Sequence, residues 1–308
     1  MAVKIGLHAG PQDISMADLQ KLWRRADSAG FHWISVWDHF YANPIRERTD
    51  PCFEGVAAMT ALAASTSKAR VACLVFCTLF RNPGLLAKSM VTVDHLSGGR
   101  AEVGLGAGWF EEEFHEFGYD FGTPKERMDR MEESVRIIKA LLHEGQAELK
   151  GQFHQISGAV CAPRPVQKRL RVWIGGRGAK RTPRMAAQYA DGFNMAYPSP
   201  EEFQERNAAV DQHCERFQRD PKAIERSVNL HFLMHVNAAG EARAKAQRER
   251  MKSTHQSGML LGGPQQVLDQ IGAFQRAGAQ GVNIAIRPPV DWDALEGFIQ
   301  DVLPHAQR

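Results

Sequence analysis

The sequence predicts an α/β protein built as a (β/α)8 barrel. Eight short apolar runs alternate with stretches of helical periodicity along the 308 residues. Most of these runs are rich in β-branched residues, as strands buried on both faces should be. Eight strand–helix units in a chain of about 300 residues fit a closed barrel. We therefore expect a single domain over residues 1–308.

The expected elements follow each other in strict alternation. The strands cover residues 4–7, 33–38, 71–77, 101–106, 171–176, 192–196, 227–236 and 281–286. The helices cover residues 16–29, 53–65, 84–96, 124–143, 180–189, 200–219, a stretch that ends near 277, and 293–304. Ser15 is the expected N-cap of the first helix, and Gly30 lies just past its end. Residues 144–170 are expected to form an insertion with a short hairpin arm.

The alternative architecture is an open, doubly wound sheet. It predicts a G-x-G-x-x-G turn after the first strand, and residues 8–13, HAGPQD, do not supply one. Residues 104–109, GLGAGW, resemble that motif superficially. Their third spacing and their position after the fourth strand argue against a dinucleotide site.

The composition and net charge indicate the class of protein to which the chain belongs. Hydrophobic residues make up 44% and charged residues 24% of the chain, as in soluble globular proteins, and the net charge of +3 gives no reason to expect a nucleic-acid or membrane partner. The N-terminal residues lack the apolar core of a signal peptide, and no run approaches the roughly 20 apolar residues of a membrane span. The odd number of cysteines, at irregular spacing, predicts reduced thiols, no metal site and a cytoplasmic location. They are Cys52, Cys73, Cys77, Cys161 and Cys214.

The second expected strand ends on two titratable residues, Asp38 and His39. In a barrel of this kind the active site lies at the C-terminal ends of the strands. A histidine there can move a proton near neutral pH, and the neighbouring aspartate could bond a ligand N–H or bias the imidazole. The alternative is a solvated pair in which Asp38 caps a turn.

Two glycine-rich segments also follow strands. Residues 175–178, GGRG, precede a helix and could offer backbone N–H groups to a phosphate, with Arg177, Lys180 and Arg181 adding positive charge. The alternative is a glycine-rich turn that binds nothing. The glycines of residues 104–108 would let a flat ligand approach the backbone.

The residues that follow the second glycine segment are aromatic and acidic. Trp109 could stack on a ring or could be part of the core. The acidic run of residues 111–113 is expected to be a solvated loop face rather than a metal site.

Four segments occur in an order that carries a family likeness. They are AGFHWISVWDHF, VACLVFCTLFRNPGLLAKSMVTVDHLSGGRAEVGLGAGW, VWIGGRG and YADGFN. The chain resembles the luciferase-like monooxygenase superfamily, in its branch of coenzyme F420-dependent oxidoreductases. The likeness covers Val3 to about Leu303, and the block from Arg81 to Trp109 is its most specific part. It implies a barrel of the bacterial-luciferase type with insertions, which binds F420 or FMN at its C-terminal face.

The resemblance also implies roles for individual residues. His39 matches the proton donor or acceptor, and Asp38 matches the aspartate that bonds the deazaflavin ring. The other implied cofactor-binding residues are Leu74, Val75, Cys77, Ala107, Gly108, Gly175, Gly176, Arg177, Gly178 and Ala179. A non-proline cis peptide, frequent in the third strand of the family, would fall at Leu74–Val75.

One position departs from the family pattern. The F420-dependent sugar-phosphate dehydrogenases have a catalytic glutamate where this chain has Trp109. This difference argues against sugar-phosphate dehydrogenation and removes the acid partner expected for His39. Glu112 or Glu113 could reach His39, although no pattern in the sequence indicates it.

Several functions remain open at this point. The first is hydride transfer between F420 and a small organic substrate, and the second is an FMN-dependent monooxygenase that uses reduced flavin and oxygen. Arg81, Arg177 and Lys180 could meet the anionic tail of F420, which FMN lacks. A non-catalytic cofactor-binding barrel and a sugar-phosphate isomerase or aldolase are further alternatives, and the last would need a lysine at a strand end. Aromatic loop residues indicate a mostly apolar substrate pocket. The resemblance implies a homodimer, formed through the helices after the second and third strands.

Overall fold

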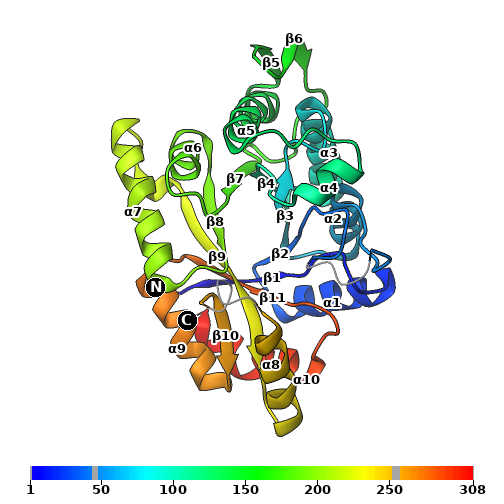
Figure 1. Ribbon diagram of the computed structural model, residues 1–308, viewed down its shortest axis with the longest axis vertical. Helices are drawn as coiled ribbons and strands as arrows, with labels where there is room; N and C mark the ends of the chain where they lie inside the picture. Colours follow the sequence, from blue (N-terminus) through cyan, green and yellow to red (C-terminus); the bar gives the residue numbers. More distant parts are fainter. Residues whose placement is uncertain (1, 44–47, 252–256, 308) are drawn as a thin grey trace.

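Eight parallel strands close into a barrel in the computed structural model, which describes residues 2–43, 48–251 and 257–307 (Figure 1). The strands are β1 (Lys4–His8), β2 (Trp33–Val36), β3 (Arg70–Cys77), β4 (Ala101–Gly106), β7 (Arg171–Gly175), β8 (Gly192–Ala196), β9 (Glu225–Met234) and β11 (Gly281–Ala285). Each pairs with its neighbour, and β9 closes the ring because it pairs with both β8 and β11. The predicted (β/α)8 barrel is confirmed.

Helices surround these strands (Figure 1). They are α1 (Met16–Ala29), α2 (Gly55–Ser65), α3 (Pro83–Leu96), α4 (Glu111–Glu116), α5 (Pro124–Lys139), α6 (Arg181–Tyr189), α7 (Pro200–Arg216), α8 (Ala238–Arg250), α9 (Pro264–Arg276), α10 (Trp292–Gly297) and α11 (Leu303–Ala306). The predicted caps of α1 are confirmed, since the Ser15 side chain accepts the Asp18 N–H and Gly30 has a φ of 89°. Leu19, Leu22 and Trp23 of α1 are buried toward the barrel.

Several predicted boundaries differ from the structure. The helix expected over residues 124–143 becomes π-helical at Ala140–Glu144, and the last helix has a π-helical turn at Phe298–Val302. The α7 helix ends at Arg216, three residues early. The additional strand β10 (Met259–Gly262) was not predicted, and it forms because β9 continues past the barrel and offers its free edge.

The predicted hairpin arm is confirmed. Strands β5 (Gln146–Lys150) and β6 (Gln155–Val160) pair antiparallel and project from one end of the molecule (Figure 1). The Glu133 carboxylate on α5 accepts the backbone N–H groups of residues 152, 153 and 154 at 2.7–3.0 Å. One acidic side chain therefore fixes the arm to the barrel. Within the described residues, no helix combines the length and the apolar character that crossing a bilayer requires.

Ion pairs and tryptophans fill the end of the barrel where the strands begin. The Glu102 carboxylate, 1% exposed, pairs with Arg70 and accepts the Trp173 indole N–H at 2.5 Å. Trp173 packs on Trp33 with ring centroids 4.6 Å apart. Arg171 binds Glu225 at 2.8 Å beside this stack. With this end filled, the opposite end is where a ligand can enter.

We expect Glu102→Ala to lower the unfolding free energy by about 3–5 kcal/mol, because the guanidinium of Arg70 and the indole N–H of Trp173 lose a buried partner. Urea unfolding measures the loss, and the exposed Glu215→Ala serves as the control. A loss no larger than that of the control would contradict this role for Glu102.

Candidate active site

The candidate site lies where β2, β3, β4 and β7 end. The carboxyl ends of parallel strands meet at one rim of a barrel, so loops far apart in the sequence become neighbours there. Asp38 and His39 follow β2, Cys77 ends β3, and Ala107 and Gly108 follow β4. The contacts described below join these residues to the loop after β7.

The Asp38 carboxylate joins the segment after β2 to the end of β3 and to the loop that follows β3. It is 4% exposed, accepts the Cys77 backbone N–H at 2.9 Å, and receives both terminal nitrogens of Arg81 at 2.6 and 2.9 Å. Arg81 also binds Glu54, the N-cap of α2. Burial opposes the charge of Arg81, but the hydrogen bonds and charge of Asp38, with Glu54, raise the pKa of Arg81 overall. Both oxygens of Asp38 already have protein partners, and its bond to a deazaflavin ring stays a prediction.

His39 has an acid partner that the sequence did not predict. Its Nδ1 atom lies 2.6 Å from Oε1 of Glu113. The same carboxylate accepts the backbone N–H of Phe40 and, at 3.3 Å, that of Tyr41. The Glu113 side chain is 1% exposed and the His39 side chain 16%. A buried carboxylate therefore fixes one nitrogen of a partly exposed imidazole.

The expected solvated acidic run is thus wrong for one of its three members. Glu111 and Glu112 have exposed side chains, but α4 turns Glu113 to the inner face together with Phe114. Successive residues of a helix point about 100° apart, so one residue of a three-residue run can be buried while the others are solvated. This helix could not be predicted, because its six residues are too few to show a helical period.

An aromatic patch lies beside His39. Trp109 is 62% exposed, and its ring meets the His39 ring edge-on with centroids 5.7 Å apart. Phe110 lies 6.2 Å from His39 and stacks on Trp109 at 5.3 Å. Of the two alternatives for Trp109, the core position is therefore excluded. The exposed edge of the imidazole lies among apolar rings.

Val75 packs against three glycines, at positions where a larger residue would overlap it. The Leu74–Val75 peptide is cis, as the resemblance implied. A Cβ atom added at Gly106 or Gly175 would lie 2.5 Å from a methyl carbon of Val75. At Gly104 it would lie 2.4 Å from a backbone oxygen of β3 and 3.2 Å from Val75. These glycines bring Val75 and the strands β3, β4 and β7 into close contact.

Gly108 and Cys77 are packed together at the same rim. Gly108 has a φ of 72°, and an added Cβ would lie 2.8 Å from the Cys77 sulfur. Burial, followed by the charge of Asp38, raises the pKa of the Cys77 thiol, so this sulfur stays protonated and packs as an apolar atom. Ala107 is partly buried and packs against the main core.

The loop after β7 has the form expected of a phosphate-binding loop. Gly176 has a φ of 146°, and a Cβ at Gly178 would meet the Thr182 hydroxyl at 2.8 Å. Gly178 and Ala179 are exposed, and α6 begins two residues later. No side chain caps the N-terminus of α6, so no side-chain hydrogen bond satisfies its first backbone N–H groups. These donors fit a phosphate group.

Nearby cations are mostly paired within the protein. Arg177 binds Glu202 of α7 at 2.7 Å, and Arg181 binds Asp129 of α5 at 2.6 Å. Lys180 is exposed and has no ion pair within the described part of the chain. Arg81, as described above, faces Asp38.

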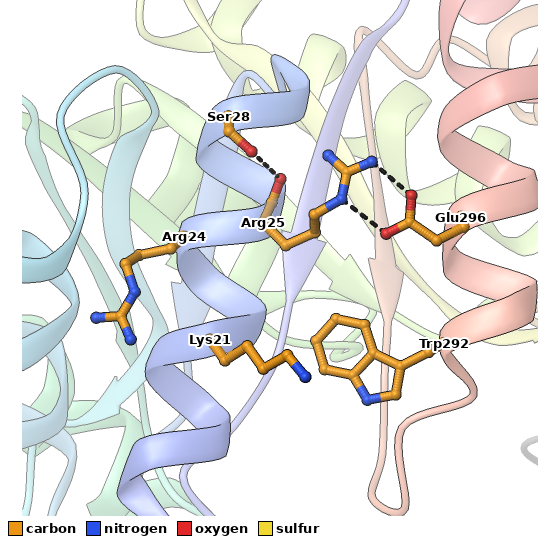
Figure 2. Close-up of a pocket in the computed structure, with 6 residues that line it drawn as sticks. All are labelled: Lys21, Arg24, Arg25, Ser28, Trp292 and Glu296. Carbon is orange, nitrogen blue, oxygen red and sulfur yellow. Dashed lines mark hydrogen bonds and ion pairs between the residues drawn. The ribbon is translucent and has the colours of Figure 1, made fainter.

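A groove of about 530 Å³ lies elsewhere, between α1 and α10 on the outside of the barrel (Figure 2). Arg25 binds Glu296 at 2.5 and 2.7 Å, and Lys21 lies 4.8 Å above the Trp292 ring. Strand ends contribute none of its lining residues, so the groove is separate from the candidate site. Across the described ranges, no cluster of His, Cys, Asp and Glu side chains could hold a metal ion.

The sequence matches the model of the family described as luciferase-like monooxygenase over residues 2–251. The chain belongs to the luciferase-like monooxygenase family. No helix or loop of the candidate site lies outside the matched residues.

Relatives in this luciferase-like family use different cofactors. An F420-dependent glucose-6-phosphate dehydrogenase of Amycolatopsis mediterranei is 29% identical over 192 residues, 62% of this chain and 56% of its own length. An FMNH2-dependent dimethylsulfone monooxygenase of Pseudomonas fluorescens is 27% identical over 320 aligned positions, 92% of this chain and 85% of its own. The chain spans less than two thirds of the length of the first curated relatives that it matches.

Solved structures show the same fold. An F420-dependent secondary alcohol dehydrogenase, in complex with an F420-acetone adduct, superposes with a TM-score of 0.85 over the full length of both chains at 18% identity. Homologues thus support a flavin or deazaflavin cofactor and an oxidoreductase or monooxygenase activity for luciferase-like proteins of this kind. They leave the choice between the two cofactors open.

We expect Gly175→Ala to lower the unfolding free energy by about 1–3 kcal/mol, because the added methyl group overlaps Val75. Adding Val75→Ala should recover part of the loss. Gly263→Ala is the control, since its Cβ would meet nothing closer than 4.0 Å. Urea unfolding of the two single variants and the double variant gives the coupling, and additive losses would contradict the overlap.

The buried His8, at the end of β1, should make the stability of the protein depend on pH. Burial, followed by the charge of Arg287, lowers its pKa from 6.5 to about 3, and its Nδ1 lies 2.8 Å from the Ser35 hydroxyl. As pH falls below 6.5, the unfolded chain takes up this proton first. Stability that is fully present above pH 6.5 is therefore lost toward pH 3, at up to about 1.4 kcal/mol per pH unit.

Urea midpoints between about pH 7 and pH 5 should thus fall less steeply for His8→Gln than for the wild type. The control is His305→Gln at an exposed position. Equal slopes for His8→Gln and the wild type would show that His8 is not held neutral.

Proposed function

We propose that this protein is an oxidoreductase that transfers hydride between coenzyme F420 and a small organic substrate. His39 gives or takes the accompanying proton. The observation that carries the proposal is the His39 ring itself, held through Nδ1 by buried Glu113 and open toward solvent beside Trp109. F420, when bound, supplies the hydride chemistry.

Each part of the site has a task in this proposal. Backbone N–H groups of residues 177–179 and of the first turn of α6 hold the phosphate. Val75, set among glycines, supports the flat ring. Trp109 and Phe110 exclude water from the substrate side and favour an apolar substrate. The imidazole of His39 protonates, or deprotonates, the substrate atom whose charge changes as hydride moves.

The second candidate is an FMN-dependent monooxygenase, and the ion pairs favour it. Two of the three cations expected to meet the anionic tail of F420 bind carboxylates of the protein instead, namely Arg81 with Asp38 and Arg177 with Glu202. FMN has no such tail and needs only the phosphate loop. The FMNH2-dependent relative also aligns over 92% of this chain.

Titration of the purified protein with F420 and FMN, each oxidised and reduced, tests both candidates. Fluorescence should report micromolar or tighter binding of F420 and weaker binding of FMN. Preference for FMN would replace the first candidate by the second, and oxygen consumption would test it next. If neither binds, both enzyme proposals fail and a barrel without this chemistry remains.

His39→Ala should lower turnover by about 10²–10⁴-fold, the usual range for a general acid or base, while cofactor affinity changes little. Gly263→Ala, far from the strand ends that hold the site, is the control. Unchanged turnover in His39→Ala would remove the proton-transfer role.

A further inference from the structure

Three hydrogen-bonding groups converge on the side chain of Glu113. The His39 ring approaches Oε1, and the backbone N–H groups of Phe40 and Tyr41 approach Oε2. Glu113 is fully buried, so water does not supply partners in their place. A carboxylate without a proton accepts hydrogen bonds only, so with Glu113 in that form all three contacts are donated to it.

We propose that Glu113 is the positioning residue of His39 and sets its tautomer. Because Glu113 accepts from Nδ1, the ring hydrogen lies on Nδ1 and the lone pair on Nε2. Nε2 is on the opposite edge of the ring, which is the edge that remains for a ligand. The inference rests on the proposed function in that His39 is taken as the proton-transfer group.

The tautomer decides what His39 can do. With the lone pair on Nε2, the resting imidazole accepts a proton from a substrate O–H or N–H. The charge that then forms on the ring is stabilised by the adjacent carboxylate, as in the acid–histidine pairs of hydrolases. With the opposite tautomer, Nε2 would carry a hydrogen and could not accept the proton.

The same carboxylate also fixes the position of the ring. Glu113 lies on α4, after β4, whereas His39, Phe40 and Tyr41 follow β2. The Tyr41 hydroxyl adds a second link, to Glu116 of α4, at 2.6 Å. The ring of His39 is therefore held between two loops and cannot turn away without moving α4.

The substitution Glu113→Gln separates charge from shape. A glutamine has one acceptor oxygen and one NH2 donor on its amide. If the oxygen faces the two backbone N–H groups, the NH2 group faces Nδ1 and drives the ring hydrogen to Nε2. If the oxygen faces Nδ1 instead, the NH2 group opposes the two backbone N–H donors. The matched control is Glu111→Gln on the same helix, where the exposed side chain of Glu111 contacts His115.

Nitrogen-15 NMR of the imidazole rings tests the inference, with the His39 signals assigned by their loss in His39→Gln. In the wild type and in Glu111→Gln, Nδ1 should be protonated and Nε2 unprotonated. In Glu113→Gln, a protonated Nε2 should appear. A wild-type spectrum with the hydrogen on Nε2 overturns the inference even if the variant does not fold. A Glu113→Gln spectrum equal to that of the wild type overturns it as well.

The measurement needs neither cofactor nor substrate, so it is independent of the proposed function. If neither F420 nor FMN binds, the proposed function is contradicted. The tautomer of His39 would still test the positioning role of Glu113. Where a cofactor binds, Glu113→Gln should lower kcat by about 10²–10⁴-fold and leave KM nearly unchanged, as for a histidine in the wrong tautomer. A change confined to KM would contradict the positioning role.

Discussion

The site depends on closure of the barrel through β9. This strand pairs with β8 through residues 225–229 and with β11 through residues 227–231, so its middle residues have partners on both sides. Without these pairings, β8 and β11 would be sheet edges with free N–H and C=O groups. With them, the carboxyl ends of eight parallel strands form one rim. Residues as distant in sequence as His39 and Glu113 can then meet at 2.6 Å.

The barrel interior divides into two chemically different halves. On β4 and β7, glycines pack against Val75 and bring these two strands close to β3. Across the barrel, three asparagines on β8, β9 and β11 form a hydrogen-bonded chain at 2.9–3.1 Å, namely Asn194, Asn229 and Asn283. One half offers a close apolar surface and the other offers amide groups.

Sequence patterns predicted the features that depend on residues close together in the chain. The order of strands and helices, the α1 caps and the hairpin arm follow from periodicity and turn chemistry, and the structure confirms them. The cis peptide at Leu74–Val75 came only from family resemblance, since no local pattern indicates it. Contacts that depend on tertiary packing were missed. β10 has only four residues and forms on an edge that β9 provides, and Glu113 becomes a partner of His39 only because the short α4 turns it inward.

The departure at Trp109 illustrates how a site can keep its chemistry with different residues. Loss of a glutamate at that position removed the expected acid partner of His39. Glu113, four residues further along the same loop, reaches the histidine from α4 instead. Trp109 is then free to lie exposed against the imidazole edge, with Phe110 stacked on it. An anionic, hydroxyl-rich sugar phosphate gains little from such rings, whereas an apolar molecule buries its surface against them. Under the proposed function, the exchange that keeps an acid beside His39 also favours apolar substrates.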